Sequence, residues 1–212
     1  MRIVMFMTAV LIVLAGCEKK SEIPAGAVDS ATDSLVKDLN RASFQSVMSN
    51  DINLVSESGI GAVRLGMTLA EARNVLPEAV FTRSTDGEGV ALVAVKLGNE
   101  DVMTVYADEE NPESPIDWTK NISFIETFSP LCHTANGIHP QSFIHDVEKI
   151  LGKTKVIQKS EIEQREYIEF ANQPPDYTFR IDNSGIFKPD STKTTLFSPD
   201  GKILSISLSS RP

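Results

Sequence analysis

The sequence contains few of the residues on which disulfide stabilisation and most enzyme chemistry depend. Its 212 residues include two cysteines, three histidines and one tryptophan. The G-x-S-x-G, H-E-x-x-H, P-loop and C-x-x-C patterns are all missing. The glycine pair in Gly59–Gly61 lacks the third glycine of a dinucleotide-binding loop, so we interpret it as a turn. These absences predict a protein that is not an enzyme and uses no cofactor.

An apolar run without charge, Ile3–Leu14, follows Arg2. It is shorter than the roughly 20 residues that a membrane-spanning helix needs. A basic residue, a short apolar run and then small residues are typical of a signal peptide. We therefore predict a signal peptide at residues 1–16. An ordinary secretory signal followed by an incidental cysteine is the alternative.

The segment Leu14-Ala15-Gly16-Cys17 resembles the lipobox of bacterial lipoproteins. The resemblance implies that Cys17 becomes the first mature residue and carries acyl chains on its sulfur and on its new amine. Glu18 follows, where an aspartate would mark inner-membrane retention in enteric lipoproteins. For a bacterium with two membranes, the resemblance implies a lipid anchor in the outer membrane and a domain that faces the periplasm.

The charge balance is acidic, with 20 basic and 29 acidic residues. Removal of residues 1–16 takes away Arg2 and no acidic residue, which makes the formal charge −10. An acidic surface disfavours nucleic acid and anionic lipid headgroups, so membrane attachment is expected through the lipid alone. Cys132 then has no partner in the chain. It is expected to be a small buried side chain, with a reactive or intermolecular thiol as the alternative.

The mature chain is divided into four parts by composition and pattern. Residues 17–28 are polar and indicate a flexible tether. Residues 29–58 are expected to be an N-terminal helical segment. Residues 59–130 and 131–212 each begin with a short helical pattern that precedes a series of strands.

The first helical pattern begins after a glycine corner at Gly66. Thr68 and Glu71 form the T-x-x-E pattern of a capping box. Pro77 marks the end, because a helix usually stops before the residue that precedes a proline. A second helix is expected at Ser142–Leu151, ended by a glycine.

The second pattern matches the first when the sequence is laid on itself without gaps at an offset of 75 residues. Gln141-Ser142 replaces Gly66-Met67, which leaves the backbone geometry of that corner open. The matched pairs are Val63 with Ile138, Leu69 with Ile144, Ala72 with Val147, and Val75-Leu76 with Ile150-Leu151.

Branched and alternating residues predict the strands. Gly98-Asn99 and Pro199–Lys202 are expected to be the turns of two hairpins. The predicted strands are 62–65, 80–83, 89–97, 102–107, 121–128, 156–159, 166–170, 177–181, 194–197 and 203–208. Helices on one face of antiparallel strands predict an α+β fold of two tandem helix-plus-antiparallel-meander modules packed as one domain.

The tandem pattern is similar to the module of the β-lactamase inhibitory proteins and to the small lipoprotein of the outer-membrane β-barrel assembly machinery. The whole layout resembles a family of uncharacterised enterobacterial-type lipoproteins. This resemblance implies a binding or structural role without catalytic residues. It is carried by Gly61, Val63, Gly66, Met67, Thr68, Glu71 and Ala72, and in the second copy by Gly137, Ile138, Ser142, Asp146 and Val147.

Three histidines, His133, His139 and His145, lie close together in the sequence, with Cys132 and Asp146 beside them. Imidazole, thiolate and carboxylate groups could together bind Zn²⁺ or Cu. However, His139 precedes the predicted helix, so it does not share a helical face with His145. Exposed histidines without a metal are the alternative.

The loop at residues 108–120 is rich in acid and proline. Asp108, Glu109 and Glu110, together with Trp118 at its base, are candidates for contact with a protein partner. The alternative is that Trp118 fastens the loop to its own core. A Ca²⁺ site is less well supported, because the loop lacks the D-x-D-x-D-G pattern.

These patterns indicate a non-enzymatic, periplasm-facing lipoprotein that binds a protein partner in maintenance of the cell envelope. The first alternative is an inhibitor or decoy of a secreted or periplasmic hydrolase, with loop 107–120 or 182–191 entering the active site. The second is a metal-binding protein that uses the cluster at residues 132–146.

Overall fold

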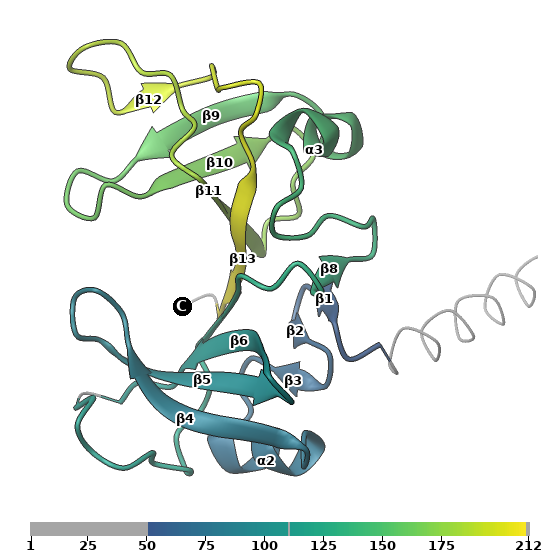
Figure 1. The fold of residues 1–212 in the computed structure, drawn as a ribbon, viewed down its shortest axis with the longest axis vertical. Coiled ribbons are helices and arrows are strands. Elements are labelled where there is room, and N and C mark those ends of the chain that lie inside the picture. The colour runs from purple at the N-terminus through teal and green to yellow at the C-terminus, as the bar shows by residue number, and fades with distance from the viewer. Residues whose placement is uncertain (1–50, 110, 211–212) are drawn as a thin grey trace, which may run out of the picture. The chain divides into compact units, whose positions relative to one another are not determined.

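A computed structural model describes residues 51–109 and 111–210 of the chain (Figure 1). These residues belong to one unit, Ser43–Pro212. The predicted signal peptide, the lipidation site Cys17, the tether and residues 29–50 of the predicted helical segment lie outside the described residues. Residues 51–58 of that segment contain a short strand. No helix in the described ranges is long and apolar enough to cross a membrane.

The described residues form two sheets. The smaller sheet has the strand order β3-β2-β1-β8 and is antiparallel except for the parallel pair of β1 and β8. Its strands are β1 (Leu54–Ser56), β2 (Gly59–Ile60), β3 (Val63–Arg64) and β8 (His133–Thr134).

The larger sheet has nine strands in the order β12-β9-β10-β11-β13-β7-β6-β5-β4. The antiparallel pair of β13 and β7 joins its two halves into one continuous sheet. The strands are β4 (Ala79–Thr85), β5 (Ala91–Leu97), β6 (Glu100–Tyr106), β7 (Phe124–Thr127), β9 (Thr154–Lys159), β10 (Glu166–Phe170), β11 (Tyr177–Ile181), β12 (Lys193–Thr194) and β13 (Ile203–Ser209).

The predicted α+β fold of two helix-plus-meander modules is wrong, because the described chain is mostly β. Its helices, α2 (Leu69–Val75) and α3 (Ile144–Leu151), have 7 and 8 residues. Each buries only two or three side chains, so neither can cover a face of the large sheet. The buried residues of both sheets and both helices form one hydrophobic cluster, so the small sheet shares in covering this core.

Helix α2 begins where the sequence predicts, whereas α3 begins at Ile144, two residues after the predicted start at Ser142. In α2 the Thr68 hydroxyl accepts a hydrogen bond from the Glu71 N–H, and the Glu71 carboxylate accepts one from the Thr68 N–H. This is the expected capping box, which satisfies two of the free N–H groups at the helix start. Helix α3 ends at Gly152, whose φ of 77° is easily reached by a residue without a Cβ.

The two helix entrances are fastened to the large sheet in the same way. The Gly66 N–H donates to the Ile122 carbonyl at 2.7 Å, and the Gln141 N–H donates to the Ile203 carbonyl at 2.7 Å. Isolated bridges then pair Thr68 with Asn121 and Phe143 with Lys202. Each helix is therefore held at the entry to a central strand, β7 for α2 and β13 for α3.

One predicted hairpin is confirmed and the other is wrong. Strands β5 and β6 pair across the turn at Gly98-Asn99. Strand β12 does not pair with β13 across Pro199–Lys202, and instead pairs with β9 at the edge of the sheet. The place beside β13 is occupied by β11 on one side and β7 on the other. A turn sequence alone cannot report that both edges of the following strand are already paired.

Candidate functional site

The acidic loop after β6 is fastened to β4 by an ion pair. The Arg83 guanidinium binds the Glu109 carboxylate through both oxygens, at 2.5 and 2.7 Å. Arg83 also donates to the carbonyls of Ser114 and Pro115. The hydrogen bonds from Arg83 hold the pKa of Glu109 below its usual range. Glu109 is buried, so it serves the loop and is not presented to solvent.

Trp118 lies against the core at the base of this loop. Its ring packs edge-to-face on Phe81 at a centroid distance of 5.9 Å, and the Arg73 guanidinium lies 4.9 Å from its centroid. This placement favours the interpretation that Trp118 fastens the loop. Asp108 is exposed, and Glu110 lies outside the described residues. The hydrolase-inhibitor alternative, which needs loop 107–120 or 182–191 to enter an active site, stays a prediction.

The three histidines do not converge. His133 is on β8, with its Nε2 3.3 Å from an Asp51 carboxylate oxygen. His139 contacts the Pro140 carbonyl through Nδ1, and His145 lies half exposed on α3 next to Asp146. Over residues 51–109 and 111–210, no group of three or more His, Cys, Asp or Glu side chains is arranged to hold a metal ion.

Cys132 is fully buried, as its sequence context predicts. Its Sγ lies 3.6 Å from the Val102 carbonyl oxygen, to which the thiol donates. Burial raises the pKa of the thiol, so the reactive thiolate form is disfavoured. Cys132 therefore packs as a small apolar side chain.

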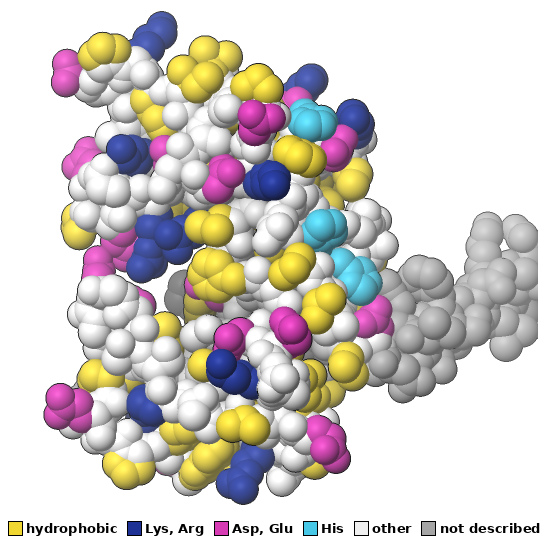
Figure 2. All heavy atoms as spheres, in the orientation of Figure 1, with side chains coloured by type: hydrophobic (Ala, Val, Ile, Leu, Met, Phe, Trp, Pro, Cys, Tyr) yellow, Lys and Arg dark blue, Asp and Glu magenta, His cyan; other side chains and the backbone are white. Residues whose placement is uncertain are grey.

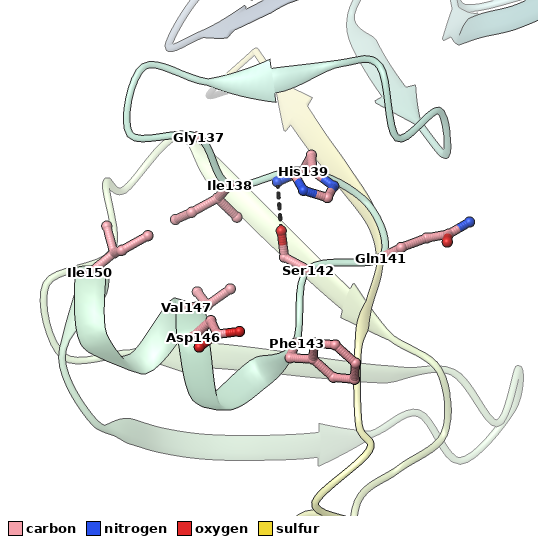
Figure 3. A pocket seen from close by; sticks show the side chains of 9 residues that line it. All are labelled: Gly137, Ile138, His139, Gln141, Ser142, Phe143, Asp146, Val147 and Ile150. Carbon is pink, nitrogen blue, oxygen red and sulfur yellow. Dashed lines mark hydrogen bonds between the residues drawn. The ribbon is translucent and has the colours of Figure 1, made fainter.

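A pocket lies beside the start of α3 (Figure 3). Its volume is about 370 Å³, in the lower part of the range of small-molecule sites. Two large apolar side chains at the pocket are exposed, Phe143 at 37% and Ile150 at 43%. The buried side chains of Ile138 and Val147 supply further apolar lining. The other lining residues are Gly137, His139, Gln141, Ser142 and Asp146.

Phe143 occupies the N-cap position of α3 and makes no side-chain cap hydrogen bond. Its ring stacks on His145 at a centroid distance of 5.3 Å, and the Lys202 ammonium lies 4.9 Å from its centroid. The neighbouring Ser142 hydroxyl accepts a hydrogen bond from the His139 N–H at 3.0 Å (Figure 3). An aromatic ring therefore stands where a helix start normally uses a polar side chain.

The sequence analysis did not identify Phe143 or Ile150 as functional residues. In the sequence, both residues stand out only as parts of the predicted second helix. The signal that could have found Phe143 is the offset of 75 residues, which places it opposite the cap residue Thr68. Of the predicted site residues, His139 and Asp146 do line this pocket.

No family model matches the chain, and no curated protein matches it. Among solved structures, the chain is similar to the crystal structure of the uncharacterized protein yfeY from Escherichia coli. The TM-score is 0.50 and the sequence identity is 14%, over 74% of this chain and 99% of that chain. At this identity the likeness shows a shared fold alone.

Proposed function

We propose that this protein is a non-enzymatic lipoprotein, anchored in the outer membrane through Cys17, that binds a protein partner in maintenance of the cell envelope. The lipobox resemblance at residues 14–17 supports the anchor and the periplasm-facing address. The pocket beside α3 supports the binding role. Its partner is a protein segment that inserts a large apolar side chain between Phe143 and Ile150.

The position of Phe143 is the observation that carries the binding role. Ser, Thr, Asp and Asn are preferred at an N-cap, and an apolar residue there costs about 1 kcal/mol. The first helix uses this preference fully through Thr68 and Glu71. An exposed ring at the corresponding position of α3 forgoes the side-chain cap and does not fill the core, which is expected of a residue that contacts a partner.

Charges around the pocket add to its selectivity. Asp146 lines the pocket, and its carboxylate interacts with Lys149 and His145. The acidic chain as a whole favours encounter with a basic partner. The partner segment is therefore expected to combine its apolar side chain with basic neighbours.

Photo-crosslinking of the full-length lipidated protein in cells tests this function. A photoreactive phenylalanine analogue is placed at Phe143, or at Val80 as the control, because Val80 is also exposed, at 55%, and lies on β4. We expect one discrete protein adduct from position 143 and none from position 80. The adduct should also disappear with Cys17→Ser, which removes the anchor. Equal labelling from both positions, or no adduct from position 143, would refute the proposal.

A further inference from the structure

A row of polar side chains crosses five strands of the large sheet. Gln158 on β9 lies opposite Tyr167 on β10, Tyr167 lies opposite Arg180 on β11, and Arg180 lies opposite Ser205 on β13. Directly opposed residues of antiparallel strands point to the same face. The neighbouring register positions, Ile157, Ile168, Phe179 and Ile206, are buried in the core on the other face.

The row continues onto β7 through a short hydrogen bond. The Ser205 hydroxyl donates to a Glu126 carboxyl oxygen at 2.5 Å. Ser207, two residues along β13 and on the same face, lies opposite Glu126. The two serines are only 1% and 6% exposed. We call Gln158, Tyr167, Arg180, Ser205 and Glu126 the polar row.

One donor of the polar row is left without an acceptor. The Nε of Arg180 is buried and has no hydrogen-bond partner within the described part of the chain. Buried donors are nearly always paired, and an unpaired one costs about 1–3 kcal/mol. The nearby Arg165 differs, because its guanidinium lies 3.0 Å from the Glu163 carboxylate. The Arg180 guanidinium therefore has one donor that no acceptor in the described residues uses.

The polar row has room for a ligand at its β9 end. A pocket of about 450 Å³ there is lined by Gln158, Tyr167, residues of the β9–β10 hairpin and Thr192. Arg180 is not part of this lining but lies opposite Tyr167 on the neighbouring strand. Figure 2 shows a hollow between this hairpin and the β4–β5 hairpin, with Lys and Arg side chains gathered beside acidic ones. The row spans four gaps between strands, about 19 Å at the usual strand spacing.

We propose that the polar row binds the carboxylate group of an organic acid, with Arg180 as the main recognition residue. A guanidinium matches the planar, two-oxygen shape of a carboxylate. The Tyr167 hydroxyl is a further donor along the row, whereas the Ser205 hydroxyl already donates to Glu126. This site lies on different strands from the Phe143 pocket and is independent of the proposed function.

The Glu126 carboxyl affects whether the polar row prefers a carboxylate or a phosphate. Desolvation is the main cause that raises the pKa of Glu126, so its neutral, proton-donating form persists to higher pH than usual. When ionised, Glu126 would repel a doubly charged phosphate more strongly than a singly charged carboxylate.

Titration of ¹⁵N-labelled protein with acetate tests the proposal without any mutation. We expect a saturable shift of the Arg180 Nε–H resonance, with a Kd in the millimolar range, and no shift with acetamide, its neutral isostere. An unmoved Arg180 resonance, or equal shifts with acetamide, would overturn it. An Arg180→Lys variant should lose acetate binding at least tenfold, whereas Arg73→Gln, which changes an exposed arginine at Trp118, should not.

Two further probes distinguish the sources of the carboxylate. N-acetyl-dialanine with a free carboxyl terminus represents a peptide, and glucuronate represents an acidic sugar. Tighter binding of the free dipeptide than of acetate, with loss on amidation, assigns the site to a chain terminus. Tighter binding of glucuronate assigns it to a sugar acid. If neither probe binds as tightly as acetate, the pocket beside Tyr167 does not hold the rest of the organic acid, and that part of the proposal is wrong.

Discussion

Gln141 holds a backbone φ of 77°, in the same left-handed region where Gly66, 75 positions earlier, holds 83°. Both residues stand immediately before a helix entrance, and their N–H groups make equivalent hydrogen bonds to a central strand. A residue with a side chain in this region is strained by about 1 kcal/mol. The geometry of the corner is therefore kept even where the glycine is not.

Reciprocal substitutions measure the strain at these two corners. Gly66→Ala should destabilise the protein by about 1 kcal/mol through its backbone conformation, because an added Cβ would meet no atom within 4 Å. Gln141→Gly should stabilise it by about 0.5 kcal/mol, since relief of strain is offset by the greater entropy of the unfolded chain. Urea unfolding checks both. Destabilisation by Gln141→Gly would show that the side chain contributes contacts that outweigh the strain.

The ion pair of Arg83 and Glu109 predicts how the acidic loop responds to acid. Since the pKa of Glu109 is lowered in the folded state, its stabilising contribution is present above the unfolded value of about 4.3 and is lost as pH falls through the folded value. Glu109→Gln should cost about 1–3 kcal/mol at neutral pH and should remove this loss. Urea unfolding at several pH values between about 3 and 7, a range that brackets the unfolded pKa, checks the prediction.

A matched control for this loop is Glu113→Gln, because Glu113 is exposed on the same loop. It should leave the free energy of unfolding unchanged within about 0.5 kcal/mol. If both variants unfold alike, the ion pair contributes nothing to stability and the loop is held by Trp118 instead.

The start of α2 and one short turn could be predicted from the sequence, and the pairing of strands far apart in the chain could not. Thr68 and Glu71 fix the start of α2 through contacts between residues three apart, and Gly98-Asn99 fixes a hairpin within a few residues. The pairing of β13 with β7, and of β12 with β9, joins segments far apart in the chain. No turn signal encodes such pairs. The predicted α+β fold therefore assigns the helices a covering role that helices of 7 and 8 residues are too short to fill.

The candidate sites show the same division. The burial of Cys132 is confirmed, because a free cysteine near a strand tends to be buried. Trp118 packs on Phe81, as the alternative interpretation expects, and its contact with a partner stays a prediction. The polar row was missed, since it depends on cross-strand register between five strands. Its one sequence signal is Ser205 and Ser207 alternating with Ile206 and Leu208, which marks a polar face on a strand at the centre of the sheet.

Ionisation of the buried Glu126 carboxyl is expected to make the folded protein less stable as pH rises. Its pKa is raised in the folded state, so the folded protein binds more protons than the unfolded chain above about pH 4.3, and stability falls as pH increases through that window. Desolvation and the Glu163 charge raise the pKa, while the Ser205 hydrogen bond and the charges of Arg180 and Arg165 oppose this.

Substitution of this residue should reverse that effect. Glu126→Gln cannot ionise and still accepts from Ser205, so it should gain stability over the natural chain at pH 7 and lose that advantage near pH 4, close to the unfolded value. Glu88→Gln, at an exposed position, is the control. Thermal unfolding at the two pH values checks the prediction, and an advantage that does not change with pH would contradict it.

Phe143→Thr separates a role in folding from a role in binding. The substitution places a threonine opposite Thr68 in the offset of 75 residues, with Asp146 at the position of Glu71. A cap at this position should stabilise α3 by about 0.5–1 kcal/mol. Loss of the ring contacts with His145 and Lys202 reduces this gain. If Phe143 serves to contact a partner, the variant should unfold at a urea concentration equal to or higher than that of the natural chain. With the photoreactive analogue placed at Ile150, the variant should nevertheless lose the partner adduct. A variant that is clearly less stable and keeps its partner would assign the ring to the fold.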